Sequence, residues 1–426
     1  MTFEILNSDT MSRKKVALLM TVGTGIGKDK EKARAGLANA MLRSIISRNP
    51  DRIILFGSEE SKYTVEALKD LYLKTFDEEF DFYDFEQIDD IDSFKKYFTE
   101  IKSYVTYLED EYYIVIDYTY GTKTMTMSAA MVSMACRKEL IFVSGERENG
   151  IVVKGSEEVK NQNLFPIYDS LLLEKIKDAF NANRYETAKS LLSELVDPKI
   201  NKEAYYKLIN AYSYFDDVNY VEAKNSFDFK LFSNEWPELT DDFQKNIKSL
   251  KILNKETQSQ KIYYVLASLI NNARRRYEEN KFDDAIARLY RSLELIGQIK
   301  LEEFGLDSSD IDLDRLNELN VDVEFINGLK SLKDSDGKIK IGLIKDFEVI
   351  SYLDDDLAKF YNENDKRIQN VVKFRNSSIL AHGMEAKSAE EYFEFKDIVL
   401  KAANVLNPKI NEYIKDTSFP EFSLNR

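Results

Sequence analysis

The run Val16-Ala17-Leu18-Leu19-Met20 is the first apolar segment of this 426-residue chain, and Thr21-Val22-Gly23-Thr24-Gly25 follows it directly. Consecutive apolar residues with no polar alternation predict a strand that is buried on both faces. A glycine-rich turn and then a helical pattern through Ile46 come after it. This order of strand, turn and helix is typical of a parallel sheet that carries helices on both faces.

The same alternation continues to about residue 155. Strand-like runs recur at residues 52–56, 80–85, 113–117 and 140–143, with helical patterns at 63–74, 93–108 and 123–137. We therefore expect a Rossmann-like α/β domain over residues 1–165. Folds of this kind bind ligands at the carboxyl ends of the strands.

Beyond Pro166 the strand signal stops and the sequence is helical in pattern. We expect an all-α linker of stacked helical hairpins over residues 166–255 and a second all-α domain over residues 256–426. Three segments share one pattern, an aromatic residue three positions before an alanine with an asparagine just upstream: 185–188, 220–223 and 282–285. The pattern predicts the start of the second helix of a hairpin.

Composition narrows the classes of function. The net charge of −15 argues against a protein that coats nucleic acid, so no stable DNA binding is expected. Two basic runs, Arg274-Arg275-Arg276 and Lys366-Arg367 through Lys373 to Arg375, remain as local candidates. The single cysteine, Cys136, fits a reducing cytoplasm, and no run is long and apolar enough to span a membrane.

Two glycine-containing loops follow predicted strands. The loop from Thr21 through Gly23, Thr24 and Gly25 to Lys28 departs from both the phosphate-loop pattern and the dinucleotide fingerprint. ATP hydrolysis and NAD chemistry are therefore not supported. The second loop is Gly121-Thr122-Lys123-Thr124-Met125. Small residues and helix-start amides at one sheet edge predict a ligand that carries phosphate, and the alternative is a tight turn without a ligand.

The chain has one histidine, His382, which stands seven residues after Arg375. On a continuous helix, residues i and i+7 lie on the same face, so we expect a stripe of Arg375, Asn376 and His382. Histidine transfers protons near neutral pH, although a histidine just before Gly383 can also be only a cap or a packing residue.

The single histidine and the single cysteine also limit the kinds of metal site that the chain can form. One histidine and one cysteine cannot build a site with several such ligands, so we expect no metal. Asp117, at the end of a predicted strand, is the most suggestive acid. It suits a magnesium ligand and an Asx turn equally.

Taken together, these segments resemble the CRISPR-associated ribonucleases of type III systems that join a CRISPR-associated Rossmann-fold (CARF) sensor to a HEPN nuclease domain. The resemblance rests on the loop 21–25, the loop 121–125 and the HEPN signature, in which six residues separate Arg375 from His382 and Asn376 fills the polar position. The segment Asp283–Glu294 also resembles the opening helix of that nuclease domain.

The resemblance implies an endoribonuclease that acts as a homodimer on single-stranded RNA and is activated by cyclic oligoadenylate, with tetra- and hexa-adenylate both open. It places the activator on residues of the two loops: Thr21, Gly23, Thr24, Gly25, Gly121, Thr122, Lys123 and Met125. It assigns catalysis to Arg375, Asn376 and His382, without a cofactor. The alternatives are a binding scaffold with an inactive HEPN-like domain and a Rossmann-type nucleotide enzyme.

Overall fold

The computed structural model describes residues 14–25, 29–148, 151–152, 155–196, 199–255, 259–353, 355–381 and 383–423. His382 and Ile26-Gly27-Lys28 of the first loop lie outside the described residues. The chain divides into two compact units, one made of Met1–Leu171 with Val196–Lys199 and the other of Leu172–Leu195 with Ile200–Arg426.

The N-terminal unit is built on a six-stranded sheet in the order β3-β2-β1-β4-β5-β8. Its strands are β1 Lys15–Val22, β2 Arg52–Gly57, β3 Tyr83–Gln87, β4 Tyr112–Asp117, β5 Glu139–Ser144 and β8 Glu158–Asn161. The first five are parallel, and β8 pairs antiparallel to β5. The strand order reverses beside β1, between β2 and β4, as it does in Rossmann-like folds. The predicted Rossmann-like α/β domain is confirmed.

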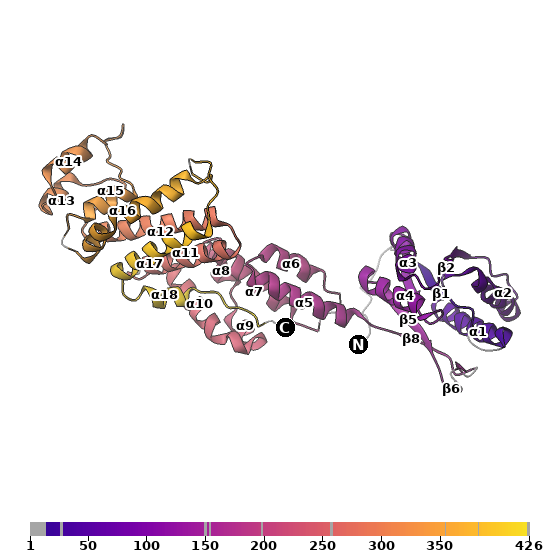
Figure 1. Ribbon diagram of the computed structural model, residues 1–426. Coiled ribbons are helices and arrows are strands. Elements are labelled where there is room, and N and C mark those ends of the chain that lie inside the picture. Colours follow the sequence, from indigo (N-terminus) through magenta and orange to yellow (C-terminus); the bar gives the residue numbers. More distant parts are fainter. Residues whose placement is uncertain are drawn as a thin grey trace. The chain divides into compact units, whose positions relative to one another are not determined.

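Alternate residues of β1 supply two separate hydrophobic cores. Leu18 and Met20 pack with residues of α1 (Lys30–Arg48) and α2 (Lys62–Phe76). Ala17 and Leu19 pack with residues of α3 (Phe94–Leu108) and α4 (Lys123–Cys136). Figure 1 shows these two helix pairs around the sheet. Burial of both faces explains why β1 is a continuous apolar run.

Two expectations for this unit need correction. The third strand begins at Tyr83 rather than Phe80, because Phe80 stacks on the Tyr83 ring and contacts Tyr72 of α2 in a cluster of aromatic side chains. The sheet is also not purely parallel, since β8 adds an antiparallel edge. Its sequence Glu-Val-Lys-Asn has the charges of an edge strand and lacks an apolar run. The strands β6 Arg147–Glu148 and β7 Ile151–Val152 form a separate pair.

After β8 the described chain folds into helices, so the expected all-α character of the remainder is confirmed. The α-helices are α5 Phe165–Asn181, α6 Tyr185–Ser193, α7 Lys202–Asp216, α8 Tyr220–Ser226, α9 Phe229–Glu235, α10 Thr240–Leu253, α11 Lys261–Glu278, α12 Phe282–Glu303, α13 Leu313–Glu318, α14 Val323–Lys330, α15 Leu343–Ile350, α16 Asp356–Ser377, α17 Ala389–Leu406 and α18 Ile410–Asp416. Two 3₁₀ turns lie at Glu59–Ser61 and Pro237–Leu239.

The recurring aromatic–alanine pattern marks helix starts as predicted. Helices α6, α8 and α12 each begin at the aromatic residue, and the three alanines are completely buried. Asn183 and Asn280 adopt the left-handed conformation, with φ of 58° and 59°, in the turns before α6 and α12. Asparagine tolerates this conformation at a helix end better than most residues do.

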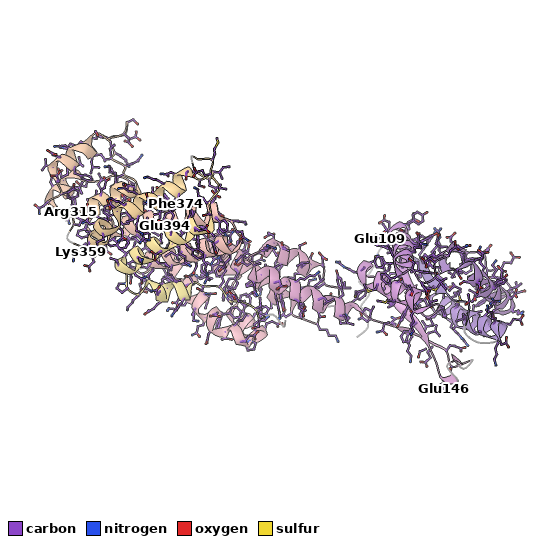
Figure 2. All side chains as sticks on the ribbon, in the orientation of Figure 1. Glu109, Glu146, Arg315, Lys359, Phe374 and Glu394 are labelled. Carbon is purple, nitrogen blue, oxygen red and sulfur yellow. The ribbon has the colours of Figure 1, made fainter. Side chains whose placement is uncertain are left out.

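Helix α12 is the central element of the C-terminal unit. It packs against α11, α15, α16 and α17, and its residues Leu289, Leu293 and Ile296 are completely buried. The N-terminal turns of α12 therefore lie beside the C-terminal end of α16, where Arg375 is located. The labelled Phe374 marks this end of α16 in Figure 2.

Candidate functional site

The two predicted ligand loops meet at the carboxyl ends of adjacent strands. The loop containing Gly23 follows β1 and the loop containing Gly121 follows β4, and these two strands pair directly. A methyl group at Gly23 would lie 3.0 Å from the Gly121 Cα and 3.1 Å from its nitrogen. Glycine at position 23 is what allows the two backbones to approach this closely.

Gly121 is needed for a second reason, its backbone conformation. Its φ is +122°, and a side chain there would lie 2.6 Å from the Met125 sulfur. Thr122 then caps the N-terminus of α4, with its hydroxyl accepting a hydrogen bond from the Met125 N–H at 3.3 Å. Lys123 is exposed in the first turn of α4, where its positive charge is placed unfavourably in the field of the helix dipole.

Direct ligand contact predicted for Thr21 and Met125 has to be corrected, because both are buried. Thr21 is 1% exposed, and its hydroxyl donates to the Tyr120 carbonyl. Met125 is 2% exposed, and its sulfur accepts from the Thr122 N–H at 3.3 Å. These two residues shape the loops, while the surface of this edge is formed by Gly23, Thr24, Gly25, Gly121, Thr122 and Lys123.

Asp117 is buried beneath the second loop, where its carboxylate accepts several hydrogen bonds. Its Oδ1 accepts from the Thr119 N–H at 2.9 Å and its Oδ2 from the Ser44 hydroxyl of α1 at 2.5 Å. Burial raises the pKa of this carboxyl, and the hydrogen bonds from Ser44 and Thr119 oppose the rise. The bond to the Thr119 N–H is an Asx turn. Of the two interpretations, the structure therefore favours the turn over a magnesium ligand.

In the C-terminal unit, the expected continuous helix from Arg375 to position 382 is wrong. Helix α16 ends at Ser377, and Ser378 has an extended backbone with ψ of 148°. The chain then turns back, since the Gly383 N–H donates to the Ser378 carbonyl at 3.1 Å and the Glu385 N–H donates to the Ser377 carbonyl at 3.1 Å. His382 itself lies outside the described residues.

Gly383 is the sequence feature that requires this turn. A Cβ at position 383 would lie 1.9 Å from the carbonyl oxygen of Ser377. Only glycine lets the returning chain pass so close to the helix end.

Arg375 lines a cavity of about 290 Å³ at the C-terminal end of α16. Its guanidinium carbon lies 4.8 Å from the centre of the Tyr290 ring, and one of its nitrogens donates to the Asn376 side-chain oxygen at 3.3 Å. Asn376 is exposed. Stacking on an aromatic face holds the plane of a guanidinium while its N–H edge stays available to bind an anion.

Helix α12 supplies the opposite wall of the cavity, with residues to which the sequence patterns assigned no role in the site. Asp283, Tyr290, Arg291 and Glu294 all lie on one face of the helix and line the cavity. Burial and the neighbouring Glu294 raise the pKa of Tyr290, and Arg375 opposes that rise. The spacing i, i+7, i+8, i+11 is the sequence signal that could have grouped them.

The two basic runs have different surroundings. Arg275 is 2% exposed and its Nε donates to the Asp216 carboxylate of α7 at 2.6 Å. Arg276 pairs with the same carboxylate and with Glu279. Arg275 and Arg276 of the first candidate run therefore join α11 to Asp216 of α7 and do not form an open basic pocket, while Arg274 pairs with Glu278 of its own helix at 3.6 Å. In the second run, Lys366 and Lys373 are exposed.

Among the residues that the structure describes, no group of three or more His, Cys, Asp or Glu side chains is arranged to hold a metal ion. No helix of the described chain combines the length and the apolar character that a membrane span needs.

Family models match two adjacent stretches of the chain. The Csm6 6H domain matches residues 168–258, and the Csm6 HEPN domain matches residues 254–406, which include Arg375, Asn376 and His382. The two matches together extend over more than half of the chain. The chain belongs to the Csm6 family. It is a Csm6-like CRISPR-associated ribonuclease, and the cavity beside Arg375 lies in its HEPN domain.

Solved structures of similar fold include Enterococcus italicus Csm6 bound to cyclic hexa-2′-fluoro-hexa-dAMP. The TM-score is 0.60 at 13% identity, and the similarity covers 95% of this chain and 100% of that one. At this identity the likeness shows the Csm6 fold alone. Can2 from Sulfobacillus thermosulfidooxidans in complex with cyclic tetra-adenylate reaches a TM-score of 0.24 at 12% identity, over 46% of this chain and 57% of that one. No curated protein matches the chain in sequence.

Proposed function

We propose that this chain is an endoribonuclease that cleaves single-stranded RNA without a metal ion when cyclic oligoadenylate binds its N-terminal unit. The observation that carries the proposal is the cavity in the HEPN domain, where Arg375 is stacked on Tyr290 at the helix end that precedes His382. Guanidinium binds phosphate through two parallel hydrogen bonds, so Arg375 is oriented for a scissile phosphate.

The chemistry follows from the residue types. The RNA 2′-oxygen attacks the phosphorus as a base removes its proton, and the bond from phosphorus to the 5′-oxygen breaks as an acid protonates that oxygen. Arg375 stabilises the charge that develops on the phosphate oxygens. His382 carries out proton transfer, and Asn376 orients Arg375 or the phosphate. The products end in a 2′,3′-cyclic phosphate and a 5′-hydroxyl.

A second copy of the chain completes this site in the proposal. One histidine per chain is too few for a base and an acid at the same time, and two chains supply two. Large apolar side chains are exposed near both sites: Met127 and Met131 on α4, and Ile379, Leu380 and Met384 around the turn after α16. Exposed apolar groups of this kind favour burial between protein surfaces.

The activator is placed on the two glycine loops of the N-terminal unit. Thr24, Gly25, Thr122 and Lys123 lie at the carboxyl ends of β1 and β4, beside the point where the strand order reverses. Helix-start amides and the exposed Lys123 ammonium suit phosphodiester groups. The Csm6 structure with the same fold holds a cyclic six-membered adenylate analogue, which supports a ligand of this class here.

The test is cleavage of an end-labelled single-stranded RNA with cyclic tetra-adenylate and cyclic hexa-adenylate added separately. We expect one ring size to stimulate cleavage, with cyclic phosphate ends on the upstream products and an unchanged rate in EDTA. Loss of cleavage in EDTA that magnesium restores would point to carboxylate–metal catalysis. Absence of cleavage with either ring would favour an inactive scaffold.

A further inference from the structure

Asp283, in the first turn of α12, binds both ends of the segment that contains His382. Its Oδ1 accepts a hydrogen bond from the Ser378 hydroxyl at 2.6 Å, and its Oδ2 accepts one from the Lys387 N–H at 3.3 Å. These two donors lie on either side of position 382. The Asp283 carboxylate is therefore hydrogen-bonded to both the first and the last residue of the segment Ser378–Lys387.

The segment Ser378–Lys387 is also closed on itself. Ser378 and Glu385 form a parallel β-bridge, and the Lys387 ammonium donates to the Ser377 hydroxyl at 2.8 Å. The same ammonium pairs with the carboxylates of Glu385 and Glu391, each at 3.2 Å. The result is a short loop whose two ends are tied together next to Asp283.

Burial makes these contacts costly to lose. Ser378 is 2% exposed and Lys387 is 6% exposed. A buried donor that loses its acceptor keeps the cost of having left water, so the penalty exceeds that of breaking a surface hydrogen bond. Asp283 itself lines the cavity beside Arg375.

Helix α12 thus contacts both Arg375 and the described residues on either side of position 382. Two turns beyond Asp283, the Tyr290 ring packs against the Arg375 guanidinium. We propose that Asp283 is a positioning residue for RNA cleavage, fixing the segment that contains His382 relative to Arg375. The positioning role rests on the proposed function of these two residues. Asp283 acts through the segment and not on the RNA.

The variants isolate the two hydrogen bonds. Asp283→Ala removes both of them, whereas Asp283→Asn keeps the shape of the side chain and one acceptor oxygen. Ser378→Ala removes one donor. Asp241→Ala is the matched control, because Asp241 is an exposed acid in the first turn of another helix, α10.

The first measurement is steady-state RNA cleavage with saturating activator. A misplacement of about 1 Å can cost about 100-fold in rate, so we expect kcat to fall by about that factor in Asp283→Ala and by about tenfold in Asp283→Asn. KM for RNA and activator affinity should stay within about twofold of wild type, as should all values of Asp241→Ala. Combining Asp283→Ala with Ser378→Ala should add little, since both remove the same contact.

The second measurement separates this inference from the proposed function. Amide hydrogen exchange at Gly383 and Lys387 should speed up by at least about tenfold in Asp283→Ala and stay unchanged in Asp241→Ala. If wild type cleaves no RNA but exchange accelerates, the proposed function fails while the anchoring of the segment by Asp283 holds. Unchanged exchange, or additive kcat losses in the double variant, would overturn the inference.

Discussion

Replacing Asp346 with asparagine should make the C-terminal unit more stable at high pH and leave it nearly unchanged at low pH. Asp346 lies in the first turn of α15 and is 1% exposed. A Cβ at Gly297 of α12 would lie 3.2 Å from the Asp346 Cβ, and the Asp346 Oδ1 has no hydrogen-bond partner among the described residues. A carboxylate in this position would be buried without a counter-charge, which is strongly unfavourable.

The magnitude follows from the pKa of this carboxyl. Burial raises the pKa of Asp346 from 3.8 to about 7, and the negative charge of Glu294 adds to the rise. The Ser308 hydroxyl nearby opposes it but lies outside hydrogen-bonding geometry. Between pH 3.8 and about pH 7, the carboxyl of Asp346 keeps its proton in the folded state but has released it in the unfolded state. The free energy of unfolding therefore falls as pH rises, by about 1.4 kcal/mol per unit and about 4 kcal/mol in total.

The assay uses urea unfolding at pH 5 and pH 8, followed by tryptophan fluorescence. Trp236 is the only tryptophan of the chain and is buried in the C-terminal unit, so it reports on the unit that contains Asp346. Asp346→Asn cannot ionise. Its gain over wild type should be about 3 kcal/mol larger at pH 8 than at pH 5, because about two of the three pH units over which the stability falls lie between pH 5 and pH 7.

Asp241→Asn serves as the matched control, because Asp241 is exposed in the first turn of α10. Its difference from wild type should be the same at both pH values. A gain for Asp346→Asn that differs by less than about 1 kcal/mol between pH 5 and pH 8 would show that burial does not hold Asp346 neutral.

Three further changes test other parts of the molecule. Arg375→Lys keeps the charge but loses the fork and the stack on Tyr290, so kcat should fall by about 100- to 1000-fold in the RNA assay; a rate within threefold of wild type would speak against the role of the guanidinium. Gly121→Ala places a side chain at φ +122° and 2.6 Å from the Met125 sulfur, so titration calorimetry should show weakened binding of cyclic oligoadenylate; wild-type affinity would exclude this loop from the ligand site. Asp216→Ala strips Arg275 of its buried partner and should destabilise the chain by about 3–5 kcal/mol; an unchanged melting temperature in calorimetry would show that the cluster is dispensable.

The sequence predicted the elements whose signals are local. The apolar run of β1 and the buried alanines at 188, 223 and 285 need no knowledge of distant residues. The loops after β1 and β4 were also correctly paired, because parallel strands in this fold bring their carboxyl ends to one edge. The sequence does not predict strand β8, since its four residues include two charges and no apolar run.

The contacts that shape the cavity are not local, and the sequence could not supply them. Asp283 meets Ser378 across 95 positions of the chain, and the contact between Tyr290 and Arg375 also joins two helices that are far apart in sequence. The sequence does not reveal that the helix ends at Ser377, because the helical pattern that contains Arg375 shows no break at this position. What ends α16 is the returning chain, which fits only because position 383 is glycine.

For the arginine run at 274–276, the sequence likewise does not reveal which distant residues surround the side chains. Adjacent cations suggest a binding surface for phosphate, yet Arg275 and Arg276 face a single buried carboxylate, Asp216. A sequence count of charges cannot distinguish a surface patch from a buried ion pair. The distinction comes only from the packing of α11 against the helices before it.

In the proposed function, one imidazole per chain carries out the proton transfer of activator-dependent RNA cleavage. The most direct measurement compares wild type with His382→Ala in cleavage of labelled single-stranded RNA, with the stimulating cyclic oligoadenylate at saturation, and measures binding of that ligand to both proteins. The proteins should carry no histidine tag, so that position 382 remains the only imidazole. We predict that His382→Ala binds the ligand with wild-type affinity and cleaves no RNA. Cleavage by His382→Ala at a rate near that of wild type would show that His382 does not transfer the protons.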